Sequence, residues 1–304
     1  MDWGKKLLIG LAGTLALPTP LLAAQARTAS ALQQRQSAPR PAIWLLSDAD
    51  TRIYLFGTVH ILHPQLRWRS AMFDRIAREA QELALEVTDE DMSAASDTEG
   101  AGAQLATPVP VLDRVSPARR EGLAALMREL QLPEGSLDRL ETWAVSVNLT
   151  VLWMAHDYTG GQSEVPGVEE ALTREFRANG RPVLGVETAA DQLAAFRTMP
   201  QAVQQAMLDE TVDAYINGEQ AGDAGEEDWI AGNVDGIAAE QDDFPPELFE
   251  SLIVRRNRNF AGWLVRRLER PGTVLFAIGA SHLAGRASVQ SMLESRGLRV
   301  QRIH

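Results

Sequence analysis

Residues 273–282, TVLFAIGASH, decide the fold of this chain together with a second stretch of the same form at residues 52–60, RIYLFGTVH. Each stretch begins with a short run of apolar and β-branched residues, which is typical of a buried β-strand. Each ends in a Gly-x-x-His motif, in which the glycine lets the backbone turn or be approached closely. His60 and His282 therefore follow directly after strands, at the sheet edge where ligands of α/β sheets bind. The two motifs predict one shared site built from both ends of the sequence.

Other strand-like and helix-like segments extend outward from these two motifs. Further strands are predicted at residues 43–46, 82–87, 182–186 and 298–303. Helices are predicted at residues 68–81, 116–130, 136–154, 169–179 and 246–269, and also from about residues 188 and 200. Residues 89–110 are acidic, aperiodic and rich in small residues, so we expect a long surface loop there. Because strands lie near both ends of the chain and helices fill the middle, the sequence predicts an α+β fold with a central β-sheet flanked by helices.

The composition of the chain limits its function classes. The chain has 304 residues, of which 45% are hydrophobic and 23% are charged, as in an ordinary globular protein. Its formal net charge is −12, so it lacks the basic surface by which proteins bind nucleic acid. Cysteine is absent, so any metal must be held by His, Asp, Glu or water.

The first 26 residues have the pattern of a secretory signal peptide. Lys5 and Lys6 form a basic start, residues 7–23 are apolar, and Ala24-Gln25-Ala26 is a small-x-small cleavage site. The alternative interpretation is an uncleaved membrane anchor. Glycines and prolines interrupt the short apolar run, which disfavours a stable membrane span.

The rest of the chain divides into two parts. Residues 27–41 are rich in Ala, Gln, Ser and Pro, a composition typical of a flexible tether. Residues 42–304 are expected to form the folded domain. We therefore expect a periplasmic or secreted protein that has no stable membrane span after the signal peptide is cleaved.

Two glutamates stand at the ends of apolar, strand-like runs. Glu86 and Glu187 each end such a run, and a threonine follows within two residues. One such glutamate alone can simply cap a helix N-terminus, where the helix dipole favours an anion. Two glutamates and two histidines at strand ends, however, form a set of side chains suited to binding a divalent metal or exchanging protons.

The helix predicted at residues 246–269 carries a polar residue on an apolar stripe. Asn257 interrupts this stripe, and Arg256 lies beside it on the neighbouring stripe. In one interpretation, Asn257 bonds a backbone carbonyl and Arg256 pairs with a surface carboxylate. In the other, both side chains point at the site, where arginine can stabilise an oxyanion or hold a carboxylate.

These features together resemble the TraB/PrgY/GumN family, which is related to the TIKI-type metalloproteases and more remotely to the ChaN-like and erythromycin-esterase proteins. The resemblance covers most of the chain from Trp44 to Ile303 and rests on an ordered set of motifs. They are Gly57 to His60, Glu86, Pro166-Gly167-Val168, Gly185-Val186-Glu187-Thr188, Arg256-Asn257 and Gly279 to His282. Two positions depart from the family pattern: Glu169 stands where the family often has Asp, and Arg255 where it often has Glu.

The resemblance implies a metal-dependent hydrolase. In the TIKI-type branch Mn or Co supports peptide cleavage, and Zn is a further candidate here. The expected metal ligands are His60, Glu86 and His282. Glu187 is expected to act as the general base, and Arg256 and Asn257 to hold the substrate or an oxyanion.

Two alternatives to this function stay open. One is a non-catalytic protein that binds or sequesters a metal, haem or a peptide. The other is a metal-free, esterase-like hydrolase that uses a His–Glu pair. In the hydrolase interpretations the partner is a peptide or small-molecule substrate, and nucleic acid is not expected in any of them.

Overall fold

A single mixed β-sheet lies at the centre of the computed structural model, which describes residues 39–98, 103–159, 167–219 and 223–304. The predicted signal peptide and residues 27–38 of the predicted tether lie outside these ranges. Within the described chain the sheet has six strands, and all six coincide with predicted strands. They are β1 (Ile43–Ser47), β2 (Thr51–Thr58), β3 (Glu82–Leu85), β4 (Val183–Gly185), β5 (Gly272–Gly279) and β6 (Val300–Arg302).

The strand order β4-β3-β5-β2-β1-β6 brings the two Gly-x-x-His motifs together. β5 lies between β2 and β3 and is parallel to both, with Thr58 opposite Gly279 and Leu85 opposite Ala277. β4 is parallel to β3, whereas β1 is antiparallel to both β2 and β6. The carboxyl ends of β2, β3, β4 and β5 therefore share one edge of the sheet.

Helices pack on both faces of this sheet, which confirms the predicted α+β fold. They are α1 (Ala71–Glu79), α2 (Asp89–Thr98), α3 (Arg120–Glu129), α4 (Thr142–Thr159), α5 (Val168–Ala178), α6 (Ala189–Arg197), α7 (Gln201–Ile216), α8 (Asp223–Ala231), α9 (Val234–Gln241), α10 (Pro246–Phe249), α11 (Arg255–Arg267) and α12 (Val289–Glu294). None of the helices in the described ranges has the length and apolar character needed to cross a bilayer.

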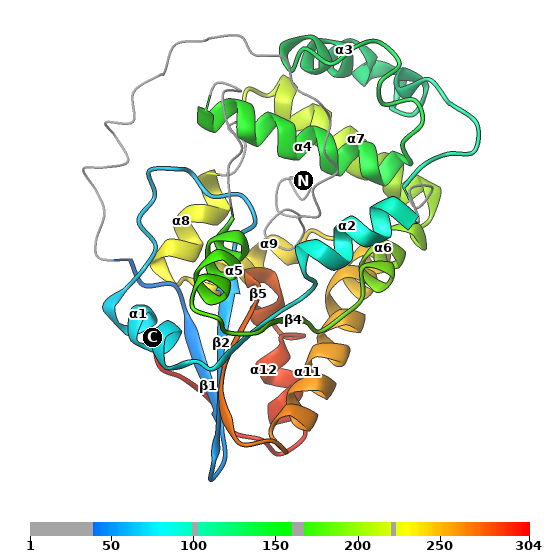
Figure 1. Ribbon diagram of the computed structural model, residues 1–304. Coiled ribbons are helices and arrows are strands. Elements are labelled where there is room, and N and C mark those ends of the chain that lie inside the picture. Colours follow the sequence, from blue (N-terminus) through cyan, green and yellow to red (C-terminus); the bar gives the residue numbers. More distant parts are fainter. Residues whose placement is uncertain (1–38, 99–102, 160–166, 220–222) are drawn as a thin grey trace.

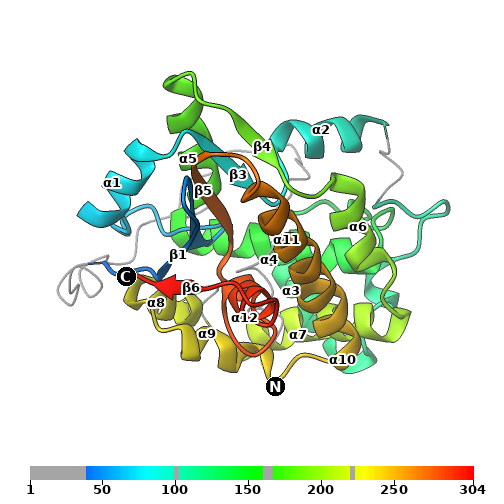
Figure 2. The same cartoon turned by 90° about the horizontal axis from the view of Figure 1, so that it is seen from below.

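Helices cover both faces of the sheet (Figure 2), and each face carries an apolar core. On one face α1, α5 and α8 contribute Phe73, Phe176 and Trp229, which are buried in a common core with strand residues. On the other face α11 and α12 contribute Phe260 and Leu293. Because both faces are covered, β5 is buried along almost its whole length, as its continuous apolar sequence predicts for a central parallel strand.

A separate helical layer of α3, α4 and α7 lies above the sheet (Figure 1). Its core contains Leu126 of α3, Leu149 of α4 and Val212 of α7, all fully buried. This layer stands on the side of the sheet where the carboxyl ends of β2 and β5 lie. The edge that carries the two histidines is therefore inside the molecule.

The prediction of one long loop over residues 89–110 was wrong. Its first part is helix α2, which begins at Asp89. The Oγ1 of Thr88 accepts a hydrogen bond from the backbone N–H of Asp91 at 3.2 Å, as a helix cap does. The three acidic residues 89–91 lie in the first turn, where the helix dipole favours negative charge. The acidic composition therefore marks a helix N-terminus.

The long helix predicted at residues 246–269 is present, but it is not uniform. α10 leads into a π-helical turn, Glu250–Val254, and then into α11. π-Helical turns are often found at functional sites. This one ends two residues before Arg256 and three before Asn257.

Candidate functional site

The two Gly-x-x-His motifs pack against each other at the carboxyl ends of β2 and β5. A Cβ atom added at Gly57 would lie 3.0 Å from the Cα of Ala280, so the glycine of the first motif allows the second motif to approach closely. His282 lies in the short 3-10 turn Ala280–Leu283 that follows β5, and His60 lies two residues beyond β2. The predicted meeting of the two motifs is therefore present in the fold.

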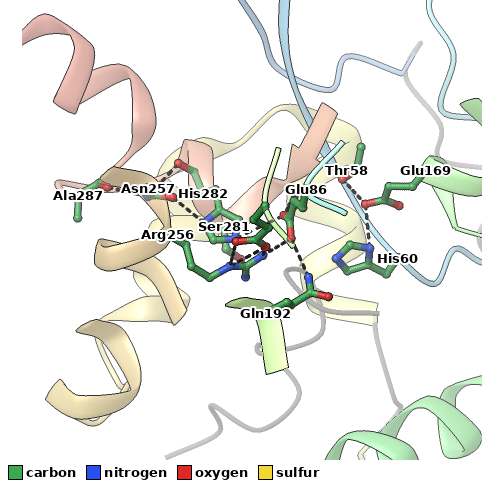
Figure 3. Close-up of polar contacts among 12 residues, drawn as sticks. Thr58, His60, Glu86, Glu169, Gln192, Arg256, Asn257, Ser281, His282 and Ala287 are labelled. Atoms are coloured by element: carbon green, nitrogen blue, oxygen red, sulfur yellow. Dashed lines mark hydrogen bonds and ion pairs between the residues drawn. The ribbon is translucent and has the colours of Figure 1, made fainter. Parts of the chain in front are cut away.

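Asn257 fixes the ring of His282. The amide Nδ2 of Asn257 donates to the backbone carbonyls of His282 (3.3 Å) and Ala287 (2.7 Å). Its Oδ1 therefore faces the Nδ1 of His282, at 2.6 Å. An amide oxygen only accepts, so Nδ1 carries the proton, and in the neutral ring Nε2 holds a lone pair. Figure 3 shows these contacts at the left of the cluster.

The other nitrogen of His282, Nε2, lacks a hydrogen-bond partner in the described structure. The residue is fully buried. Oε1 of Glu86 lies 3.5 Å from this nitrogen. Burial lowers the pKa of His282 to about 3, despite the opposing influence of Glu86. The ring is therefore neutral at ordinary pH, and its lone pair faces a carboxylate oxygen.

Arg256 joins the two strand-end glutamates. Its Nε lies 3.1 Å from each carboxylate oxygen of Glu187. Its Nη2 donates to Oε2 of Glu86 and to Oε1 of Glu187. All three residues are at most 7% exposed. The remaining guanidinium nitrogen, Nη1, is buried without a hydrogen-bond partner in the described structure.

The two glutamates have their pKa values moved in opposite directions. Burial would raise the pKa of Glu86, but the guanidinium of Arg256 and the backbone N–H of Gly279, 2.7 Å from Oε1, lower it to about 2. Burial raises the pKa of Glu187 despite its contact with Arg256. Two carboxyl groups whose pKa values differ in this way are suited to different roles, one as a fixed anion and one as a proton carrier.

His60 is oriented by Glu169. Its Nδ1 lies 2.8 Å from Oε1 of Glu169, and the same oxygen accepts a hydrogen bond from the hydroxyl of Thr58. Nδ1 is therefore the donor, and in the neutral ring Nε2 holds the lone pair. In the view of Figure 3, Glu86 lies between His60 and His282. Glu169 therefore fixes the ring of His60, as Asn257 fixes the ring of His282.

Gly167 brings Glu169 to His60. A Cβ atom at Gly167 would lie only 2.1 Å from the backbone oxygen of His60. The next residue, Val168, donates its backbone N–H to the carbonyl of Val59 at 3.0 Å. Only glycine therefore allows α5 to begin so close to the histidine.

The sequence-predicted site residues all lie at this edge of the sheet. Glu86, Glu187 and Arg256 form one ionic cluster, with His282 and Asn257 on one side and His60 on the other. Within the described ranges, no three His, Asp or Glu side chains form a group that could hold a metal as they stand. Nε2 of His282 and Oε1 of Glu86 nevertheless approach each other to 3.5 Å.

Sequence reasoning missed two contributors. Thr58 lies inside the first Gly-x-x-His motif, but its hydroxyl has no sequence signal of its own. Gln192 is buried at 3% exposure and places its Nε2 3.4 Å from Oε2 of Glu86. The sequence did carry a signal for Gln192. It lies in the first turn of the helix that Thr188 caps, and this turn directly follows Glu187.

Comparison with known proteins gives one result. No curated protein and no solved structure matches the chain. The sequence profile of the TraB/PrgY/gumN family matches residues 42–302, which is nearly the whole chain and includes every site residue described above. The chain therefore belongs to the TraB/PrgY/gumN family.

Proposed function

We propose that the protein is a divalent-metal-dependent hydrolase whose centre is built on His282 and Glu86. The observation that carries this proposal is the 3.5 Å separation between Nε2 of His282 and Oε1 of Glu86. Both atoms are acceptors in the protonation states that their surroundings favour. Two lone-pair atoms that face each other in a buried site need a proton or a cation between them.

The separation suits a metal ion. Two ligands of a tetrahedral ion, each bound at about 2.1 Å, lie roughly 3.4 Å apart. The charge balance supports the same conclusion, since Glu86 and Glu187 together carry one more charge than Arg256 compensates when both are ionised. A buried excess of negative charge favours a cation.

The donor chemistry of the site fits such an ion. His282 and Glu86 would hold it, and His60 would join them, because both imidazoles have their Nδ1 fixed by another side chain. That arrangement is common for metal-binding histidines. An ion held there supplies a Lewis acid that polarises a carbonyl or activates water.

The remaining residues have separate roles in this proposal. Glu187 is the general base, because burial raises its pKa towards the range in which a carboxylate can exchange protons. Arg256 offers the buried N–H groups of Nη1 to a developing oxyanion. Asn257 has three bonds to protein atoms, so we assign it to holding His282 rather than the substrate.

The substrate and the location of the protein are proposed from the sequence. A peptide substrate, with Mn or Co as the metal, follows from the resemblance to the TIKI-type metalloproteases. Action in the periplasm or outside the cell follows from the signal-peptide pattern of residues 1–26.

Peptide turnover with and without metal tests this function. Untagged protein stripped with EDTA should cleave members of a quenched-fluorescent peptide library only after Mn²⁺, Co²⁺ or Zn²⁺ is added. E187Q should keep the metal but lose about 100-fold or more of the turnover, whereas E86Q should lose metal affinity. E82Q is the matched control, since Glu82 pairs with Arg267 at the opposite end of the same strand; its turnover should stay unchanged.

Each alternative function predicts a different result. Cleavage that survives EDTA would support the metal-free His–Glu hydrolase. Metal binding without any cleavage, unchanged in E187Q, would support a binding or sequestering protein. Either result would overturn the proposed function.

A further inference from the structure

Helix α6 begins with an unusual pair of buried polar side chains. Thr188 caps the helix, and its hydroxyl and the side chain of Asp191 form a reciprocal capping box. In such a box the residue before the cap and the fourth helical residue are neighbours and commonly form an apolar contact. Here these two positions are Glu187 and Gln192, which are 7% and 3% exposed.

Both side chains of this pair contact the ionic cluster rather than an apolar core. Glu187 binds Arg256. Gln192 directs its amide Nε2 to Oε2 of Glu86, at 3.4 Å. A carboxylate oxygen accepts only, so the amide orientation is set. The first turn of α6 therefore supplies two polar groups to the site.

The two oxygens of Glu86 have different surroundings as a result. Oε2 receives two donors, Nη2 of Arg256 and Nε2 of Gln192. Oε1 accepts the backbone N–H of Gly279 at 2.7 Å and faces the lone pair of His282. Figure 3 shows Gln192 below Glu86, on the side of the carboxylate away from the strands. With Oε2 held from two directions, the carboxylate cannot rotate its oxygens freely.

We propose that Gln192 is a positioning residue, which holds Oε2 of Glu86 so that Oε1 is presented to a cation shared with His282. This inference rests on the proposed metal-dependent function. It adds a residue for which the resemblance implies no role, and it explains why the pair at the start of α6 is polar. A hydrogen bond that orients a ligating carboxylate typically changes metal affinity by about 10- to 100-fold when it is removed.

A glutamine with a purely structural role should affect stability rather than metal affinity when it is replaced. Gln204 provides this comparison for Gln192. Gln204 is 6% exposed and lies on α7, in the helical layer. Its Oε1 accepts the backbone N–H of Trp143 at 3.3 Å, and its Nε2 donates to the carbonyl of Met199 at 3.0 Å. Removing this amide leaves backbone groups without partners, which costs stability. Removing the amide of Gln192 frees only a carboxylate oxygen that keeps Arg256.

The test compares Q192M and Q192L with Q204M in the full mature chain. Co²⁺ affinity is measured by titration of the metal-free protein, and thermal stability is measured in EDTA. Both Gln192 variants should bind Co²⁺ about 10-fold or more weakly than wild type, while their melting temperatures in EDTA stay equal or rise. Q204M should show the reverse, with unchanged Co²⁺ affinity and a lower melting temperature.

The outcomes separate this inference from the proposed function. Wild-type affinity in Q192M and Q192L would overturn the positioning role alone, as would an equal loss of affinity in Q204M. A loss of folding in both Gln192 variants would show a structural role and would also overturn it. Failure of the wild-type protein to bind Co²⁺, Mn²⁺ or Zn²⁺ would overturn both proposals.

Discussion

At the residue scale, each histidine of the site has its Nδ1 held by another side chain. Asn257 contacts Nδ1 of His282, and Glu169 contacts Nδ1 of His60. The two histidines have different surroundings. His282 is fully buried and contacts the neutral Asn257. His60 contacts the carboxylate of Glu169, whose side chain is 19% exposed. His282 is therefore the group whose protonation the fold opposes most strongly.

The metal-free protein should lose stability as the pH falls below 6.5. Burial lowers the pKa of His282 to about 3, so below its ordinary pKa of 6.5 the unfolded chain binds a proton that the folded protein does not. The free energy of unfolding should fall by up to about 1.4 kcal/mol per pH unit in this range. The matching loss from Glu86, with its pKa lowered to about 2, begins only below the ordinary glutamate value of 4.5.

Urea denaturation in EDTA between pH 5 and 8 measures this effect. Between pH 6.5 and 5 the free energy of unfolding of H282Q should fall by about 2 kcal/mol less than that of wild type. H156Q is the control, since His156 is 28% exposed on α4. Identical pH profiles for wild type and H282Q would show that His282 is not held neutral.

At the scale of elements, the site depends on how closely helices and loops approach the carboxyl edge of the sheet. α5 begins against the His60 loop through Gly167 and Val168. The π-helical turn before α11 and the polar first turn of α6 bring the other charged groups to the same edge. Each contact joins segments that are distant in the sequence.

G167A should disturb both the fold and the site, because its Cβ would lie 2.1 Å from the backbone oxygen of His60. A forced shift of this kind destabilises by about 1–3 kcal/mol, and it should also weaken Co²⁺ binding by moving His60. G262A on α11 is the control, where the nearest atom is 3.5 Å away and the helix should gain about 0.5–1 kcal/mol. Urea denaturation measures the stability of both variants, and Co²⁺ titration measures their metal affinity. Unchanged Co²⁺ affinity in G167A would exclude His60 as a ligand.

The sequence predicted the strands, but it did not predict the contacts that the candidate site residues make. Apolar runs such as residues 273–278 mark buried strands directly, because a strand covered on both faces has no polar alternation. Helix α2 was missed because its sequence has small residues and no apolar stripe. The sequence allowed a backbone carbonyl as a partner of Asn257, but it did not identify Ala287, which lies in a loop whose path depends on packing. Gln192 was overlooked because its role appears only when β3 and α6 are placed together.

At the scale of the whole molecule, the site lies where a sheet covered on both faces meets a separate helical layer (Figure 1). The N-terminal segment contacts this body through Arg40, which donates its backbone N–H to the carbonyl of Ile230 at 2.8 Å. The carbonyl of Arg40 also lies close to Gly232. The end of the predicted tether therefore packs on α8.

The exported protein should begin at Arg27, and its stability should depend on only the last few tether residues. A chain that begins at Pro39 should unfold like the mature protein. A chain that begins at Ala42 loses the Arg40 contact and should be less stable by about 1 kcal/mol, the net value of one hydrogen bond. N-terminal sequencing and urea denaturation check these outcomes. An exported chain that starts at Met1 in the membrane fraction would contradict the signal-peptide prediction.

The central claim is that His282 and Glu86 share a divalent cation, and cobalt stoichiometry tests it most directly. Untagged wild-type protein, stripped with EDTA and titrated with Co²⁺, should bind one ion per chain with a visible absorption band. H282A should lose that ion, whereas H156A should keep it. Binding that is equal in wild type and H282A, or no binding by wild type, would contradict the account.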